Sequence, residues 1–512
     1  MFLTKIRIVC AFVIPVVSAS AFFGFSNGWP PVQYQERSDR MPHSDFRCNP
    51  DDRLVGCGIR SPGSRYCTDA CLLFVQSTNE LTVQQSSSTP LTQPKTTTPD
   101  AWKLYDPDPN HVWNQLYRSL YRRVARDGRE YGYDELDPLL WWSTKYLLKT
   151  PAYPQVVNVL DQFLSTQAEK KISDPLKRAI LQRDLWAIFD WTTTVSNSSQ
   201  EKLKLQIKLA QVIKRLALPS DQIAALPDTY KQATKSGRFA IGYDPKRREQ
   251  PYLPPDLFDN NGPWVQLSAR GGLPVAPGHV GFSSGRSVFR VFIRLPEGRE
   301  QTLKYLKTLT DFPKPWLPDP ADTHRLLPNP DLPDFPTGTQ LALVRAMVLI
   351  DSQGDLKPTN IIEDIQLRVH RTIPNEIPPA LQTDRNKALE AIDVYEFKFR
   401  RSKLFDSENG GLYPIMRGDA EFPLFNSHGI DLFEESSPGF SLERGLRVSL
   451  KACASCHFRP GVHSMLSRRP DSEILKSWDV NYEAMQATGW KGKQYNWGLL
   501  QGLWNSQPTP QK

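Results

Sequence analysis

A pair of cysteines followed at once by a histidine, near the carboxyl end of the chain, constrains the fold more than any other feature. The pattern is Cys453-Ala454-Ser455-Cys456-His457. Two thiols separated by two residues can form thioether bonds to the two vinyl groups of one haem. The adjacent histidine can then donate a ring nitrogen to the iron. The pattern predicts that this part of the chain folds around one flat, covalently bound cofactor.

The same cysteine pair has two alternative interpretations. A thioredoxin-like redox disulfide also uses C-x-x-C, but it requires a preceding strand in a βαβ unit. Residues 440–450 have apolar positions at helical spacing, so we expect a helix directly before Cys453. A structural zinc site requires further ligands, and no second cysteine pair lies nearby. Only the haem interpretation also gives His457 a chemical role.

The attachment pattern and its expected helical approach resemble those of c-type cytochromes. The resemblance covers residues 437–512 and implies a small α-helical cytochrome c-like domain with one haem c. It also implies that Cys453 and Cys456 hold the haem and that His457 is the proximal iron ligand. The other ring nitrogen of His457 is predicted to donate to a carbonyl within residues 458–462.

The second axial ligand of the iron is predicted from distance along the chain. Met485 is ranked first, because the 28 positions that separate it from His457 are enough to wrap around the ring edge. Met465, His463 and His428 are the alternatives, and an open iron face is another. A methionine would raise the reduction potential relative to two histidines, whereas an open face would permit ligand binding.

The amino terminus has the pattern of an export signal. Lys5 and Arg7 precede an apolar run over residues 8–17, and Ala19-Ser20-Ala21 supplies small residues for cleavage after Ala21. Haem c is attached outside the cytoplasm, which is where an export signal directs a chain. We therefore expect a periplasmic or secreted protein. No later stretch approaches the roughly 18 apolar residues of a membrane span, and no transmembrane segment is expected in the mature chain.

Four further cysteines lie close together after the predicted signal peptide. In an exported chain, such a group most often forms two disulfides, and the sequence leaves three pairings possible. A zinc ion bound by four thiolates is the alternative, although the spacing lacks paired C-x-x-C motifs. The four disulfide candidates are Cys48, Cys57, Cys67 and Cys71.

The charge of the chain restricts the partners that we expect. Lysine and arginine number 63 against 55 acidic residues, and this net charge of +8 is modest and without a long basic block. Nucleic acid is therefore not expected as a partner. A redox partner protein with an acidic surface is compatible with this balance, because opposite charges accelerate encounter.

Composition and periodicity predict a multidomain α+β chain. Apolar residues recur at helical spacing from residue 101 onward, whereas alternation between apolar and polar residues in 286–295 and 394–400 predicts strands with one wet face. Residues 351–355 form a turn signal between two apolar runs and predict a hairpin. The predicted parts are a signal peptide (1–21), a Cys-rich segment (22–76), a Ser/Thr/Pro/Gln-rich linker (77–100), a helical bundle (101–239), a β-rich sandwich or barrel-like region (240–436) and the haem domain (437–512).

Three functions are compatible with these features. The first is one-electron transfer by an iron with two axial ligands. The second is a haem enzyme or a gas or peroxide sensor with an open distal site. The third is an extracytoplasmic binding or scaffold protein in which the haem is ancillary, because electron transfer alone does not require the long regions before residue 437. The sequence does not decide whether the chain is an enzyme.

Overall fold

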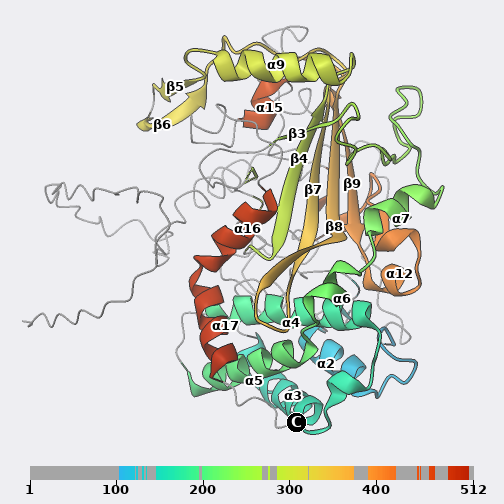
Figure 1. Ribbon diagram of the computed structural model, residues 1–512, viewed down its shortest axis with the longest axis vertical. Coiled ribbons are helices and arrows are strands. Elements are labelled where there is room, and N and C mark those ends of the chain that lie inside the picture. The colour runs from blue at the N-terminus through green and yellow to red at the C-terminus, as the bar shows by residue number, and fades with distance from the viewer. Residues whose placement is uncertain are drawn as a thin grey trace, which may run out of the picture. The chain divides into compact units, whose positions relative to one another are not determined.

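The computed structural model describes the chain from residue 103 onward, with gaps (Figure 1). All these residues belong to one compact unit, Ser61–Lys512. The predicted signal peptide, the four amino-terminal cysteines and the linker lie outside the described residues. The described ranges are 103–121, 123–124, 130–131, 134, 146–194, 199–267, 275–276, 279, 285–320, 322–373, 390–421, 447–448, 450, 461–466 and 483–506.

Helices predominate in the first half of the described chain, as their apolar spacing predicts. The longest, α4 (Pro175–Thr194), is buried at every position from Ala179 to Thr192. A helix that is buried all round lies at the centre of its neighbours. These neighbours are α2 (Val112–Tyr121), α3 (Ala152–Ser165) and α5 (Gln200–Leu216), followed by the short α6 (Ser220–Ala224) and α7 (Thr229–Lys235).

Six strands form one open antiparallel sheet in the order β10-β9-β8-β7-β4-β3 (Figure 1). The two longest strands, β7 and β8, form the predicted hairpin, which is confirmed by their antiparallel register. The Asp351 carboxylate accepts the amides of Gln353 and Asp355 at the turn, each at 2.9 Å. The strands are β3 (Val265–Leu267), β4 (Ser287–Arg294), β7 (Gln340–Ile350), β8 (Leu356–His370), β9 (Ile392–Phe399) and β10 (Leu412–Pro414).

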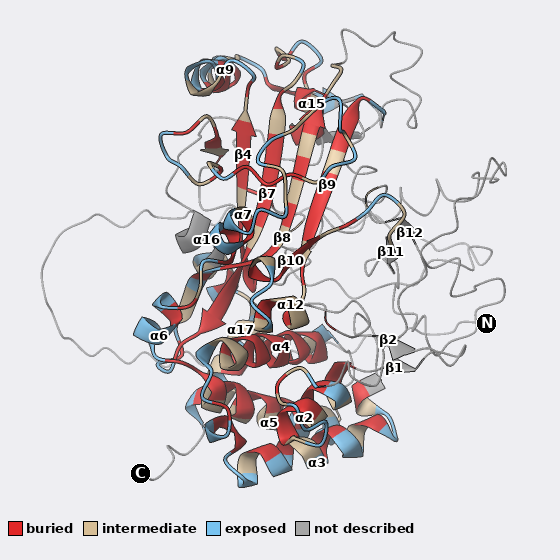
Figure 2. Cartoon of the chain, turned by 90° about the vertical axis from the view of Figure 1, so that its right-hand side faces the viewer, coloured by how far each residue is buried: buried red, intermediate tan, exposed pale blue. Residues whose placement is uncertain are grey.

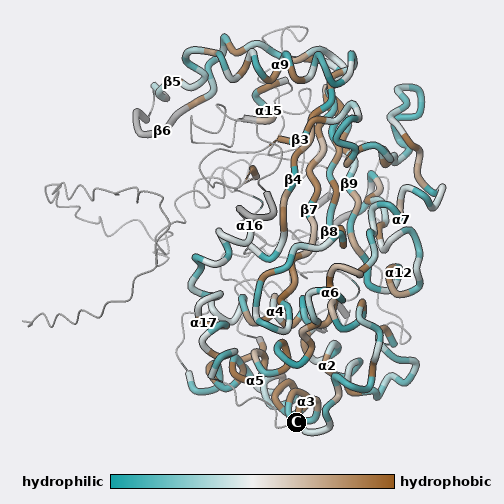
Figure 3. Tube along the Cα trace, viewed as in Figure 1, coloured by the Kyte–Doolittle hydropathy of each residue, from teal (hydrophilic) through white to brown (hydrophobic). Residues whose placement is uncertain are grey.

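Both faces of this sheet are covered, and the strands are buried along most of their length (Figure 2). Hydrophobic residues recur along the same strands (Figure 3). One face packs against residues 230–258, with Phe292 and Tyr252 in the same cluster. On the opposite face, residues of β3, β4 and β7 share a cluster with α9 (Arg299–Asp311), and this cluster contains Val291 and Leu306. A strand pair outside the sheet joins β5 (Trp316–Asp319) to β6 (Asp322–Pro328).

The last helices pack onto this same framework. Val462, in α15 (Val462–Leu466), belongs to the cluster on the α9 face of the sheet. Trp504, in α17 (Tyr495–Asn505), belongs to a cluster with α4, α5 and the ends of β4 and β7. Residues from the predicted helical, β-rich and haem regions therefore share hydrophobic clusters, and the predicted domain boundaries stay predictions. Helix α16 (Glu483–Gly492) precedes α17 and contacts β4 and β8.

The helix expected over residues 440–450 is wrong at two positions. Arg447–Val448 form strand β12, which pairs antiparallel with β11 (Ala420–Glu421). A short apolar run has no decisive periodicity, and pairing with a partner distant in sequence then determines its structure. Leu450 is helical, and residues 451–457 lie outside the described residues, so the helical approach to Cys453 stays a prediction.

Candidate functional site

The residues predicted to bind haem are placed only in part. Cys453, Cys456, His457 and His428 lie outside the described residues. Met485 belongs to helix α16. The candidate site is therefore described through the residues that hold the chain directly after the attachment pattern.

The chain after the attachment pattern is held at the end of strand β8. Gly461, four positions after His457, donates its amide to Nδ1 of His370 at 3.2 Å. The amide of Val462 donates to Oδ1 of Asp334 at 2.5 Å. These two hydrogen bonds fix consecutive backbone amides at the start of α15.

A third polar contact holds the same helix from its side. The Arg368 guanidinium donates to Oγ of Ser464 at 2.7 Å. We call the three residues His370, Asp334 and Arg368, with the segment that they hold, the α15 clamp. Its three members come from β8 and from the stretch before β7.

Gly461 is required by its backbone conformation and by its neighbour. Its φ is +77°, in the left-handed region that residues with a Cβ rarely adopt. A Cβ at this position would also overlap the carboxylate of Asp334. Glycine therefore permits the close approach on which the clamp depends.

His370 is a neutral acceptor within the clamp. The residue is fully buried, and its ring meets Phe335 edge to face at 4.8 Å between centroids. Burial lowers the pKa of His370 well below its usual value, and the positive charge of Arg368 lowers it further. Because Nδ1 accepts a hydrogen bond, we assign the proton to Nε2, which has no hydrogen-bond partner in the described part of the chain.

Asp334 is also affected by burial. Desolvation raises the pKa of its carboxyl above the usual value, although the amide hydrogen bond from Val462 acts in the opposite direction. The carboxylate is thus held in an unfavourable environment and depends on backbone amides for compensation. Burial of the charged Asp334 carboxylate in the clamp is therefore electrostatically unfavourable.

Two of the alternative distal ligands lie in α15. Met465 is buried in the apolar cluster that also contains Val462 and Leu306, so its side chain packs against the sheet. His463 is half-buried. A metal site of three or more histidine, cysteine, aspartate or glutamate side chains is absent from the described residues. His463 and Met465 therefore do not lie in such a group.

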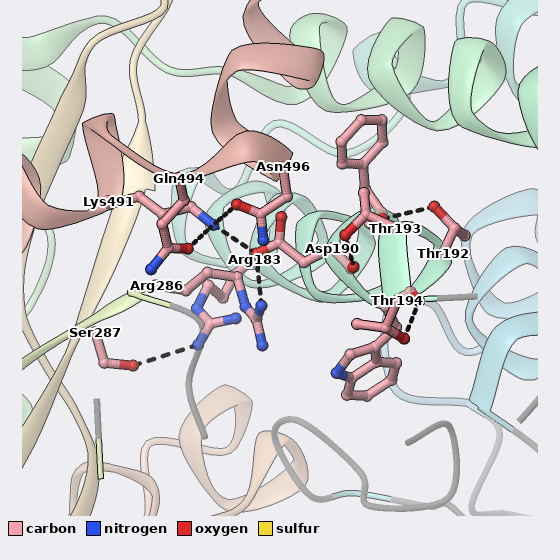
Figure 4. A network of polar contacts seen from close by, with 12 residues as sticks. Arg183, Asp190, Thr192, Thr193, Thr194, Arg286, Ser287, Lys491, Gln494 and Asn496 are labelled. Carbon is pink, nitrogen blue, oxygen red and sulfur yellow. Dashed lines mark hydrogen bonds and ion pairs between the residues drawn. The ribbon is translucent and has the colours of Figure 1, made fainter. Parts of the chain in front are cut away.

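A second polar cluster lies at the start of β4, where helices meet the sheet (Figure 4). Arg286 contacts Asp190 at 2.6 Å, Lys491 contacts Asp190 at 2.7 Å, and Arg183 contacts Glu363 at 3.0 Å. All five side chains are fully buried. We call these five residues the ionic network. It joins α4, β4, β8 and α16.

Lys491 is the member that comes from the segment after the attachment pattern. Burial lowers the pKa of its ammonium to about 8, and Asp190 opposes that shift. Nζ also donates to Asn496 at 3.1 Å and lies 5.2 Å from the centre of the Trp186 ring. Lys491 thereby ties α16 to the central helix α4.

Neither cluster was predicted from the sequence, because the members of each lie far apart in the chain. His370 and Gly461 are 91 positions apart, and Asp190 and Lys491 are 301 apart. The signals in the sequence are a lone histidine, His370, at the end of a predicted strand and charged residues such as Asp190 within a predicted helix. Each is more common as an ordinary structural residue.

No protein-family model, curated protein sequence or solved structure matches this chain. Among the described helices, none has the length and apolar character needed to cross a membrane. The site must therefore be interpreted from its own chemistry.

Proposed function

We propose that this chain is an exported, one-haem c-type cytochrome-like protein whose activity is one-electron transfer. The observation that carries the proposal is Cys453-Ala454-Ser455-Cys456-His457, in which two thiols and an imidazole have the spacing for thioether attachment and proximal ligation. The haem, once bound, supplies a single reversible redox centre. The proposed partner is a redox protein with an acidic surface.

The α15 clamp supports this proposal, because a redox site works best on rigid elements. A few residues after the proposed iron ligand, Gly461 is bound to the buried end of β8 and Val462 to Asp334, before β7. The export pattern ending at Ala21 supports the proposal independently, since haem c is attached outside the cytoplasm.

A thiol–disulfide centre at Cys453 and Cys456 is the second candidate, and strand β12 favours it. This strand ends five positions before Cys453, and thioredoxin-like cysteine pairs follow a strand. That fold needs parallel strands joined by a helix. Every pairing between strands in the described part of the chain is antiparallel, which favours the haem proposal.

Expression with a haem-maturation system, followed by denaturing electrophoresis and haem staining, tests the proposal. The wild-type band should retain haem, and Cys453→Ala combined with Cys456→Ala should abolish the stain. His111→Ala, a histidine outside the predicted haem domain, is the control and should keep it. An exported chain without stain would refute the proposal.

Carbon monoxide then separates electron transfer from the alternative of a haem enzyme or sensor. An iron with two strong axial ligands should bind carbon monoxide poorly at neutral pH after reduction. Rapid binding would instead favour an open distal site. Replacement of Met485 by alanine should convert the first behaviour to the second if Met485 is the distal ligand.

A further inference from the structure

A strongly basic segment begins in helix α7 and lies outside both polar clusters. Residues 231–251 contain six basic and two acidic side chains, and this net charge of +4 is half that of the whole chain. The two acidic residues, Asp244 and Glu249, each form an ion pair with an arginine, at 2.8 and 2.9 Å. Five of the basic residues are exposed, namely Lys231, Lys235, Arg238, Lys246 and Arg247. The segment therefore presents surplus positive charge to the solvent.

Two large apolar side chains are exposed on the same surface. Ile241 is 73% exposed and Met416 is 49% exposed. Arg417, the residue after Met416, contacts Glu249 at 2.9 Å, so Met416 lies close to the basic segment that contains Ile241. A single exposed apolar residue is ordinary on a protein surface. Here two of them coincide with surplus positive charge, and this combination indicates a partner that is both apolar and anionic.

The loop that carries Ile241 is fixed at both of its limbs. The amide of the residue before Ile241 donates to the Pro251 carbonyl at 3.2 Å, which closes the loop between them. On one limb, the hydroxyl of Tyr243 donates to the Asp393 carboxylate at 2.8 Å. On the other limb, Nε of Arg248 donates to the same carboxylate at 2.9 Å. A loop held in this way loses little conformational entropy when a partner binds, and Ile241 is already presented to that partner.

We propose that this loop docks the protein on the surface of an anionic lipid bilayer, with Ile241 and Met416 inserted below the headgroups and the basic side chains among them. Stable association with a bilayer surface takes two signals, and an apolar group beside a basic patch supplies both. A protein partner matches the surface less well, because the apolar anchors of protein interfaces are most often tryptophan and tyrosine. The inference goes beyond the proposed function and does not require the haem.

Sedimentation of the full exported chain with lipid vesicles tests this docking surface. The vesicles contain either phosphatidylcholine alone or equal parts of phosphatidylcholine and phosphatidylglycerol. The wild-type chain should bind the anionic vesicles, more weakly as the salt concentration increases, and should not bind the neutral ones. Ile241→Ser should weaken this binding about tenfold, because apolar burial is lost. Lys246→Ala should weaken it about fivefold, which corresponds to the loss of one basic residue at an anionic surface.

Two matched control variants lie on helix α9, outside the basic segment. Leu303→Ser removes an apolar side chain that is 47% exposed, and Lys304→Ala removes an exposed basic one. Both variants should bind the anionic vesicles as the wild-type chain does. Denaturant unfolding should be unchanged in all four variants, because each replaced side chain is exposed.

Several results would overturn the proposed docking. Absence of binding to anionic vesicles is one, and equal binding by the wild-type chain and Ile241→Ser is another. Retention of the chain on immobilised polyglutamate, without vesicle binding, would replace the bilayer with an acidic protein as the partner. A dimer in light scattering that Ile241→Ser dissociates, again without vesicle binding, would replace it with a second copy of this chain.

Discussion

The α15 clamp and the ionic network hold the same part of the chain by different means. The clamp fixes two backbone amides, those of Gly461 and Val462, with a neutral imidazole and one carboxylate. The network fixes helix α16 through Lys491, whose charge lies among fully buried ionic side chains. Removing one partner of a buried ion pair costs several kcal/mol, whereas one neutral hydrogen bond contributes about 1 kcal/mol. The network is therefore expected to contribute more to the free energy of unfolding than the clamp.

The largest expected effect is at the centre of the network. Asp190→Asn leaves Arg286 and Lys491 buried without their shared carboxylate. The free energy of unfolding, measured with denaturant, should fall by about 3–5 kcal/mol. Asp161→Asn is the control, because Asp161 pairs with Lys208 at the surface and such pairs contribute at most about 1 kcal/mol. Equal losses at both sites would remove the distinction between network and clamp.

A smaller loss is expected when one cation is removed. Lys491→Met should lower the free energy of unfolding by about 1–3 kcal/mol, because Asp190 keeps Arg286 and the methionine can pack against Trp186. Thermal and denaturant unfolding both measure this change. The exposed Lys493, two positions further on, provides the control Lys493→Met, which should be close to neutral. A larger loss than at Asp190 would contradict the central place of that carboxylate.

The clamp can be opened by one added carbon atom. Gly461→Ala should lower the free energy of unfolding by about 2 kcal/mol, from left-handed strain and from overlap with Asp334. Gly489→Ala in α16 is the matched control, since a Cβ there meets no neighbouring atom. A helical alanine should be neutral or stabilising at that position. Similar effects of the two substitutions would show that Gly461 is not held as described.

The lowered pKa of Lys491 predicts a pH dependence that the clamp should not share. The pKa of about 8 in the folded protein lies below the ordinary lysine value of 10.5, so the unfolded chain binds more protons between these values. Stability of the native protein relative to Lys491→Met should consequently rise with pH across that window, by less than about 1.4 kcal/mol per unit. A relative stability that falls with pH would contradict the direction of the shift.

The smallest effect on stability is expected at His370. His370→Leu removes one unsatisfied buried N–H and leaves another, so the free energy of unfolding should change by less than about 1 kcal/mol. Denaturant unfolding of His370→Leu and of the wild-type chain provides the measurement. A loss comparable with that of Asp190→Asn would show that the clamp contributes as much to stability as the network.

Local features of the fold were predictable because their causes are local. Apolar spacing predicted α4 and α5, and the turn residues 351–355 predicted the hairpin of β7 and β8. The same reasoning was wrong at Arg447–Val448, where a short run pairs with β11. The prediction failed because this run pairs with a strand distant in sequence, and a short sequence window does not include that partner.

The two clusters were not predictable, because they join residues far apart in the chain. Arg183 and Asp190 are seven positions apart on α4 and thus lie on one face of that helix, yet their partners come from β4, β8 and α16. Gly461 was the strongest local clue to the clamp, as a glycine between a proline and a valine. Its partners became identifiable only once β8 and α15 were placed together.

Intact mass of the exported, denatured chain tests the central claim most directly. Covalent attachment predicts a mass greater than that of the polypeptide by one haem, lost when both Cys453 and Cys456 are replaced by alanine. A mass lower by two hydrogens at this cysteine pair would instead identify a disulfide. Either that result or free thiols at Cys453 and Cys456, after expression with haem maturation, would contradict the account.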